Sequence, residues 1–367
     1  MESPAGRRTA IVATVGVSSE RRSCVEGLVM AGADVIRLSM VNGTRERHLN
    51  VARYVREIAA ESGRGVRLLA DLQGRKNRIG ALPGGRADWA TGEKVVLTAR
   101  PDAAASHRTW VTHAWEPGTV PVGSSVLIDD GAVILAVEEA DADVLRCSVV
   151  EGGPVTDGRG VTMRGGHLRP GLTERDADDL RFAVSLGVDM VALSFARPDD
   201  HHVLRDLAPD RMLIGKVEHP TAVDRLSDMA AVYDGLMVAR GDLALELPFE
   251  EVPAVQKRTI AACARAGTHS MVATQLLHSM RESSRPTRAE VADVANAVLD
   301  GADSLMLAGE TGFGRHPVRA VDTLRRVIES AERYADECRA DPPLGGSPNH
   351  SPVPGRSPVP ATHTPER

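Results

Sequence analysis

Eight short runs of β-branched or aliphatic residues recur along the chain, and a stretch of helical character follows each run. The runs lie at residues 9–16, 34–39, 66–73, 189–195, 212–218, 235–243, 270–277 and 304–311. Nearly continuous apolar character is typical of parallel strands that are buried on both faces, because half-exposed antiparallel strands alternate apolar and polar residues. Eight alternating strand and helix units predict an α/β fold, a (β/α)8 TIM barrel.

The helical stretches are expected at about 18–32, 44–62, 174–186, 198–207, 220–230, 250–266, 288–300 and 316–338. Two of them carry explicit start signals. Thr287 and Glu290 form a T-x-x-E capping box, and Thr173 with Asp176 opens another helix in the same way.

The barrel pattern is interrupted after the third strand. Residues 81–166 contain short β-type runs separated by Asp-Gly and Gly-Gly turns, which are hairpin signals. We therefore expect a (β/α)8 barrel from residues 1–80 and 167–338, and a β-barrel lid domain inserted between them. The last stretch, 339–367, holds eight of the 22 prolines and little that could build a core, so we expect a disordered Pro-rich tail.

The composition excludes several classes of protein. Hydrophobic residues make up 42% of the 367 and charged residues 26%, a balance typical of globular proteins. The net charge of −6 gives no support for a nucleic-acid binder, and no apolar run reaches the ~18 residues of a membrane span. The four cysteines include no CxxC pair and predict neither a disulfide framework nor a zinc site. The N-terminus lacks the layout of a secretory signal, so we expect a cytoplasmic protein.

Charged residues at the carboxyl ends of the strands carry the most information, because barrels of this type have their active sites there. Lys216 and Glu218 are two residues apart, so on a strand their side chains point to the same side. The same spacing separates Arg240 from Asp242. The polar residues at strand ends are Arg37, Asp71, Lys216, Glu218, Arg240, Asp242, Thr274 and Glu310.

Two of these residues suggest a metal. Glu218 and Asp242 end neighbouring strands and could share one Mg²⁺, a hard cation held by few carboxylates plus substrate oxygens. Arg37, Lys216 and Arg240 make the surroundings cationic, which suits a phosphorylated or carboxylated substrate. The alternative is that the charges form structural ion pairs across the barrel mouth. Their convergence at one rim favours a functional site, because burying charges is costly.

Several sequence blocks resemble the pyruvate kinase family, and the resemblance covers almost all of residues 9–338. Lys216-Val217-Glu218 is similar to the block with the family's catalytic lysine and first magnesium ligand, and the run from Asp234 to Leu243 is similar to the block with the second. Further matching blocks are Ala273-Thr274-Gln275, Arg285 to Glu290, Asp293 to Asp303, and Gly309-Glu310-Thr311. The resemblance also implies the inserted domain after strand three.

The resemblance implies transfer of a phosphoryl group from phosphoenolpyruvate to ADP, which gives pyruvate and ATP in glycolysis. Mg²⁺ would be the cofactor, and Glu218 and Asp242 would be its ligands. Lys216 would neutralise the phosphoryl group in flight and then the enolate. Arg37 would hold the phosphate.

The remaining contacts with substrate are implied by position as well. Thr274 would lie beside the methylene carbon that is protonated. The backbone N–H groups of Gly241 and Asp242 would bind the substrate carboxylate. On the nucleotide side the implied residues are Arg78, Arg159 and Asn42.

Departures from the usual family pattern concern a potassium site. Val41 and Leu72 stand where the family offers ligand oxygens. Yet Leu72, Gln73 and Lys76 resemble the potassium-independent branch of the family, in which a lysine ammonium replaces the ion. We therefore expect Lys76 to supply that charge and no requirement for K⁺. The alternative is that Lys76 is a solvated loop residue.

The Pro-rich stretch stands where the family has a C-terminal regulatory domain. We therefore expect no allosteric control by sugar phosphates or AMP, and either a monomer or a barrel-mediated homodimer. The alternative functions are a paralogue with another phosphoryl acceptor in a specialised pathway, a barrel lyase that acts on a pyruvate enolate, and a non-catalytic ligand-binding barrel. Lys216, Glu218 and Asp242 together favour catalysis, because a barrel without catalysis has no physical need for that charge cluster.

Overall fold

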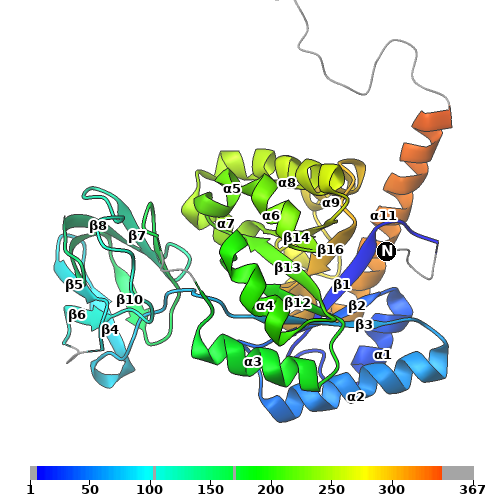
Figure 1. The fold of residues 1–367 in the computed structure, drawn as a ribbon, viewed down its shortest axis with the longest axis horizontal. Helices are drawn as coiled ribbons and strands as arrows, with labels where there is room; N and C mark the ends of the chain where they lie inside the picture. Colours follow the sequence, from blue (N-terminus) through cyan, green and yellow to red (C-terminus); the bar gives the residue numbers. More distant parts are fainter. Residues whose placement is uncertain (1–5, 102–104, 168–170, 341–367) are drawn as a thin grey trace, which may run out of the picture.

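The computed structural model describes residues 6–101, 105–167 and 171–340. It shows a large α/β barrel with a smaller all-β unit beside it (Figure 1). Most of the predicted tail, residues 341–367, lies outside the described residues. Among the described residues, no helix combines the length and the apolar character that crossing a bilayer requires.

The predicted barrel is confirmed. Eight parallel strands close on themselves, each paired with its neighbour in the chain order of the barrel strands, and β16 pairs back onto β1. The barrel strands are β1 (Ala10–Val15), β2 (Val35–Ser39), β3 (Arg67–Leu72), β12 (Met190–Leu193), β13 (Met212–Val217), β14 (Gly235–Ala239), β15 (His269–Ala273) and β16 (Ser304–Leu307).

Helices surround the barrel, and two of them begin at the capping boxes that the sequence predicts. Both predicted capping boxes are present: the Thr173 hydroxyl accepts the backbone N–H of Asp176, and the Thr287 hydroxyl accepts that of Glu290. The helices are α1 (Arg22–Ala31), α2 (Arg45–Ser62), α3 (Glu174–Ser185), α4 (His201–Leu207), α5 (Pro220–Asp224), α6 (Leu226–Val232), α7 (Arg240–Glu246), α8 (Val252–Ala266), α9 (Arg288–Leu299), α10 (Gly309–Gly312) and α11 (Pro317–Ala340). Short 3-10 turns lie at Pro83–Gly85, Pro198–Asp200, Phe249–Glu251 and His278–Arg281.

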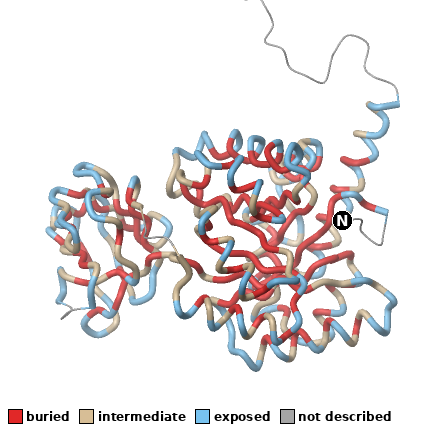
Figure 2. The backbone as a smooth tube through the Cα atoms, viewed as in Figure 1, coloured by how far each residue is buried: buried red, intermediate tan, exposed pale blue. Residues whose placement is uncertain are grey.

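The barrel interior is a packed core and not a pore. Methionine contributes much of it, because an unbranched side chain fills irregular gaps where the chain has few aromatic residues. The residues of this inner core are Val12, Val35, Leu69, Met190, Ala192, Ile214, Met237, Met271, Ala273 and Met306. A second, larger core lies between the strands and the helices, and the buried backbone follows both (Figure 2).

The inserted domain has a hydrophobic core of its own, which includes Trp89 and Trp115. Its strands pair into a six-stranded sheet in the order β11-β7-β8-β9-β5-β6 and a two-stranded sheet, β10-β4. Two sheets therefore stand in place of a single closed small barrel. The strands are β4 (Arg86–Trp89), β5 (Lys94–Thr98), β6 (Arg108–Trp110), β7 (Ser125–Ile128), β8 (Val133–Ala140), β9 (Val144–Glu151), β10 (Gly153–Thr156) and β11 (Val161–Met163).

Several barrel strands end earlier than the apolar runs suggest. The run 235–243 is a strand only to Ala239, and Arg240 begins helix α7. The run 270–277 ends at Ala273, after which Thr274 and Gln275 both have positive φ values, 70° and 56°. The physical reason is the barrel rim, since a chain that leaves the packed interior must turn back toward the outer helices. Polar groups at these turns can therefore point in directions that strand spacing does not predict.

The turn after β3 depends on a glycine. Gly74 has φ +63°, and a Cβ there would lie 2.2 Å from the backbone oxygen of Ser194. The Gly74 amide also donates to Asp176 Oδ1 at 2.9 Å. This glycine therefore allows the loop after β3 to approach the end of β12.

We predict that Gly74→Ala destabilises the protein and lowers its turnover, because a methyl group would push against the Ser194 backbone. Gly63→Ala is the matched control, since Gly63 has φ +68° and no atom within 4 Å of its ideal Cβ. Both substitutions carry the left-handed strain of about 1 kcal/mol, but only Gly74→Ala adds the clash. Urea unfolding and steady-state kinetics should show a clearly larger loss for Gly74→Ala. Equal losses in the two variants would contradict this account.

Candidate active site

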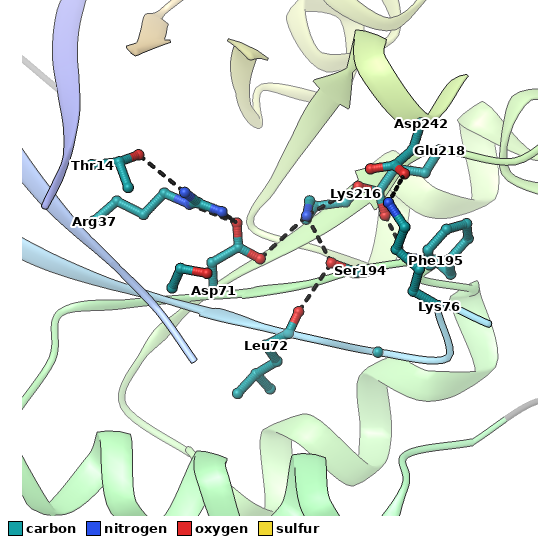
Figure 3. Close-up of polar contacts among 12 residues, drawn as sticks. Thr14, Arg37, Asp71, Leu72, Lys76, Ser194, Phe195, Lys216, Glu218 and Asp242 are labelled. Carbon is teal, nitrogen blue, oxygen red and sulfur yellow. Dashed lines mark hydrogen bonds and ion pairs between the residues drawn. The ribbon is translucent and has the colours of Figure 1, made fainter. Parts of the chain in front are cut away.

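A buried carboxylate, that of Asp71, lies at the carboxyl end of β3 with only 2% of its side chain exposed. It accepts a hydrogen bond from Arg37 Nε at 2.8 Å, and Arg37 Nη1 donates to the Thr14 hydroxyl at 3.0 Å (Figure 3). Strand pairing places these groups together, because Arg37 on β2 is level with Thr14 on β1, and Asp71 is level with Ser39 on β2. Asp71 thus fixes the Arg37 guanidinium at the barrel rim.

The same carboxylate holds the ammonium group of Lys216, which β13 carries. Lys216 Nζ lies 3.2 Å from Asp71 Oδ1, 2.7 Å from Ser194 Oγ and 3.0 Å from Glu218 Oε1. Lys216 and Glu218 therefore meet on one side, as the spacing predicts. Ser194 in turn donates to the Leu72 carbonyl at 3.0 Å, so its hydroxyl accepts from the ammonium (Figure 3).

Charge pairing decides the ionisation of both groups. Burial lowers the pKa of Lys216, but the charges of Asp71 and Glu218 outweigh burial and raise it above its ordinary value. Burial raises the pKa of Asp71, but Lys216 and Arg37 outweigh burial and lower it. Near neutral pH the pair is therefore an ammonium and a carboxylate with little water around them.

Glu218 is the second buried carboxyl group, 1% exposed. Burial raises its pKa, and the neighbouring charge of Asp242 raises it further. The backbone N–H of Phe195, a residue with φ 53°, donates to Glu218 Oε2 at 2.7 Å. Glu218 Oε1 is buried and lies 3.0 Å from the Lys216 ammonium. A buried carboxylate beside a second one, that of Asp242, is a fitting arrangement for a divalent cation, because hard cations take carboxylate oxygens as ligands.

Asp242 completes this acidic pair. It lies in the first turn of α7, and Lys76 Nζ from the loop after β3 contacts its Oδ1 at 2.5 Å. Across the described residues, no cluster of three or more His, Cys, Asp or Glu side chains could hold a metal. A Mg²⁺ ion held by Glu218 and Asp242 would therefore take its other ligands from substrate and water, as this ion commonly does.

Arg240 does not point to the same place as Asp242, and the inference from strand spacing is wrong for this pair. Arg240 starts helix α7, and its guanidinium donates to both carboxylate oxygens of Asp293, at 2.8 and 2.7 Å, and to the Thr274 carbonyl. In a helix, residues two apart point to different sides. Arg240 therefore anchors α9 and the loop after β15 and adds no free charge to the site.

The remaining candidates lie around this centre. Thr274 Oγ1 accepts the Gly241 N–H at 2.9 Å, so Thr274 and the start of α7 touch directly. Glu310 is buried and accepts the backbone N–H groups of Leu277 and Ala308, at 3.2 and 3.0 Å. Glu310 therefore holds two loop ends together in this structure.

The nucleotide-side candidates are only partly brought together. Lys76, Arg78 and Arg159 line one open polar cleft of about 430 Å³ at the edge of the inserted domain. Arg78 donates to the Gly158 carbonyl at 3.0 Å, and Arg159 to Asp129 at 3.1 Å. Asn42 lies apart from this cleft, on the loop after β2, where it donates to Ser39.

Sequence reasoning missed Ser194 and the amide of Phe195. Both follow the end of β12, and they supply an acceptor to Lys216 and a donor to Glu218. The available signal was weak, because a single serine after an apolar run is common. The positive φ of Phe195, which marks the strained turn, has no signature in the sequence.

A third buried carboxyl group, Glu246, lies where the inserted domain joins the barrel. Its side chain is 7% exposed and its Oε2 has no hydrogen-bond partner among the described residues; a small cavity there is also lined by Asn77, Trp115 and Met163. Burial raises the pKa of Glu246 to about 8, with a further contribution from Asp242. At neutral pH this carboxyl group is therefore largely protonated.

Three comparisons place the chain among known proteins. A family model described as the barrel domain of pyruvate kinase matches residues 6–321. The curated pyruvate kinase of Mycobacterium tuberculosis H37Rv is 45% identical over 344 residues, which cover 92% of this chain and 72% of that protein. That of Corynebacterium glutamicum is 43% identical over 332 residues, 89% of this chain and 70% of the relative. The crystal structure of a pyruvate kinase from Cryptosporidium parvum matches with a TM-score of 0.84 and 33% identity, over 89% of this chain and 70% of that chain.

We predict that Glu246 makes stability fall as the pH rises. Its pKa is raised from 4.5 in the unfolded chain to about 8 in the fold. The fold therefore favours the protonated carboxyl group. The resulting contribution to the free energy of unfolding is fully present below pH 4.5 and is lost as the pH rises through 8. The slope reaches at most about 1.4 kcal/mol per pH unit. In Glu246→Gln the amide cannot ionise, so the decline in unfolding free energy between pH 5 and 9 should be shallower. Parallel curves for the two proteins would show that Glu246 does not titrate in this way.

Proposed function

This chain belongs to the pyruvate kinase family, and we propose that its phosphoryl-transfer site is the chain of charges formed by Arg37, Asp71, Lys216 and Glu218. The reaction moves a phosphoryl group from phosphoenolpyruvate to ADP and yields pyruvate and ATP. The bond from phosphorus to the enol oxygen breaks, and a bond to a β-phosphate oxygen of ADP forms. Negative charge is thus released onto the enolate.

The observation that carries this assignment is the Lys216 ammonium, held at the barrel rim by three oxygens. Such a fixed cation stabilises the charge on a phosphoryl group in transit and then the charge on the enolate. Preorganisation matters, because a cation that is already desolvated and oriented needs no rearrangement at the moment of reaction. Arg37, 14% exposed and fixed by Asp71 and Thr14, would bind the substrate phosphate.

Glu218 and Asp242 would hold the divalent cation on which members of this family generally depend. When bound, Mg²⁺ supplies positive charge to the substrate carboxylate and phosphate oxygens. Burial raises the pKa of Glu218 and the charge of Asp242 raises it further; a cation between the two carboxylates would relieve that repulsion, which supports this role. Lys76 would have to share Asp242 with the ion or release it.

Thr274 and the start of α7 would orient the organic part of the substrate. The amides of Gly241 and Asp242 lie in the first turn of α7, where orphan N–H groups suit a carboxylate. The Gly241 amide now donates to Thr274 Oγ1, so substrate would replace that bond. The freed Thr274 hydroxyl would then lie beside the carbon that is protonated.

On the nucleotide side, Arg78 and Arg159 would bind the phosphates of ADP in the polar cleft at the inserted domain. Two arginines suit phosphate, because the guanidinium fork donates in parallel to phosphate oxygens. Asn42 would contribute only if the loop after β2 approaches this cleft. The inserted domain, residues 81–166, would act as the lid of the barrel formed by residues 1–80 and 167–338.

Lys76 would replace the monovalent cation. Its ammonium lies against Asp242 at the edge of the site, where a positive charge supports a substrate with two anionic groups, a phosphate and a carboxylate. Leu72, which offers no oxygen, is fully buried, and Asn42 bonds to Ser39 instead of facing a metal. Turnover would then not require K⁺. For the assembled protein we propose a cytoplasmic monomer or barrel-mediated homodimer; Phe249 beside α8, 79% exposed, offers an apolar contact for the dimer.

We predict that pyruvate release from phosphoenolpyruvate, with Mg²⁺ and ADP, is the same with and without K⁺. Lys216→Met should reduce turnover by at least ~10²-fold, the usual loss when one group that stabilises developing charge is removed. Strong activation by K⁺ would contradict the role of Lys76, while the activity itself would stand. Retention of activity in Lys216→Met would contradict the assignment of the site.

The matched variants for the cation role are Lys76→Met and Lys257→Met. Lys257 also forms an ion pair, with Asp300, but on the outside of the barrel. Lys76→Met should lower turnover, and addition of K⁺ should not restore it fully, because Leu72 still denies the ion an oxygen ligand. Lys257→Met should behave as the unmodified protein does.

A further inference from the structure

An open groove of about 1320 Å³ runs along the outside of the barrel between α9 and α11, and its lining includes none of the residues proposed for phosphoryl transfer. Its walls combine apolar side chains with arginines. Tyr334 is 57% exposed, Leu299 45% and Val291 36%, and all three line the groove. Exposed apolar side chains that face one groove, with an aromatic side chain among them, suit a binding surface, because a tyrosine offers both apolar area and a polar tip.

The groove lies next to the point where the chain leaves the described fold. Helix α11 ends at Ala340, six residues after Tyr334, and its last turns extend past the barrel (Figure 1). Residues 341–367 continue from there. This segment is therefore tethered within about 10 Å of one end of the groove, at 1.5 Å of helix rise per residue.

The sequence of that segment suits a groove with an exposed tyrosine. It contains eight prolines and the tetrapeptide Ser-Pro-Val-Pro twice, at 351–354 and 357–360. The repeats are six residues apart, which is two turns of a polyproline II helix, so in that conformation Val353 and Val359 would share one face. Proline-rich segments of this kind bind aromatic grooves well, because little conformational entropy remains to be lost.

The lengths also agree. Groove residues on α11 extend from Arg319 to Tyr334, about 22 Å of helix. Residues 351–360 would span about 31 Å as polyproline II, enough to follow that length. The ten residues 341–350 before them include Gly345-Gly346, which allows the chain to reverse its direction. They reach about 33 Å when extended, so the second segment can return to Tyr334.

We propose that residues 351–360 of this chain dock into the groove between α9 and α11 of the same molecule. The prolines and valines pack on Tyr334, Leu299 and Val291. The arginines of the groove form a polar rim that stays in contact with water. Tethering favours this occupant, because a short flexible link gives an effective concentration of about 1 mM. With a Kd of about 0.1 mM for the free segment, the groove would be roughly nine-tenths occupied.

Photo-crosslinking tests the location. A benzoylphenylalanine is placed at Gly355, between the two repeats, in the full chain, and crosslinked peptides are mapped by mass spectrometry. We expect crosslinks to residues 291–299 and 319–334. A mixture of ¹⁴N- and ¹⁵N-labelled chains separates crosslinks within one molecule from those between molecules. Crosslinks between molecules, crosslinks to another surface, or no crosslinks would each overturn the proposal.

Peptide binding tests the energetics. A synthetic peptide of residues 351–360 should bind the full chain about tenfold more weakly than it binds Val353→Ser/Val359→Ser, because the native segment competes for the groove and the double variant does not. Tyr334→Ala/Leu299→Ser should abolish peptide binding. Val318→Ser, on α11 but outside the groove, is the control and should bind as the unmodified chain does. Equal affinity for the full chain and the tail variant would contradict docking.

Discussion

The site depends on one buried carboxylate between two cations. Asp71 contacts both Arg37 and Lys216, and without it the two positive charges would lie near each other in a place with little water. The charge of Arg37 acts to lower the pKa of Lys216, while Asp71 and Glu218 raise it above its ordinary value. Asp71 more than compensates and turns two costly charges into a fixed pair of cations that can face a phosphorylated substrate. Its own burial, between β2 and β12, keeps water from screening the interaction.

Around this centre the charges alternate, and the alternation explains how the site can take a doubly charged ion and an anionic substrate together. Glu218 is shared by Lys216 and the Phe195 amide, while Asp242 is engaged by Lys76. Phe195 and Thr274 both have positive φ values where a non-glycine side chain costs free energy. Backbone strain of this kind at two strand ends is typical of functional sites, where the conformation of a turn serves ligand binding and departs from the conformation that its residues prefer.

The barrel could be predicted from the sequence because its strands and helices have recognisable local sequence patterns. The continuous apolar runs and the two capping boxes needed no knowledge of distant residues. The directions of side chains at the rim could not be predicted. Arg240 points to Asp293 because helix α7 starts at Arg240, and a two-residue spacing does not reveal where a strand ends. The bridge from Asp71 to Lys216 and Ser194 was also hidden, because it depends on the pairing of β3, β12 and β13, which brings these three side chains to the same end of the barrel. Local patterns thus identified which residues carry charge, while tertiary pairing decided which charges meet.

The most direct test of this account is the kcat/KM for phosphoenolpyruvate of Asp71→Asn, measured beside Asp34→Asn. Asp34 is an equally buried aspartate paired with an arginine, Arg7, so both variants should lose about 3–5 kcal/mol of stability. Asp34 precedes β2 and therefore lies at the end of the barrel opposite to the site. We expect kcat/KM to fall by at least ~10²-fold in Asp71→Asn and to stay near the unmodified value in Asp34→Asn, at a temperature where both are folded. Equal activity in the two folded variants would contradict the claim that Asp71 organises the site.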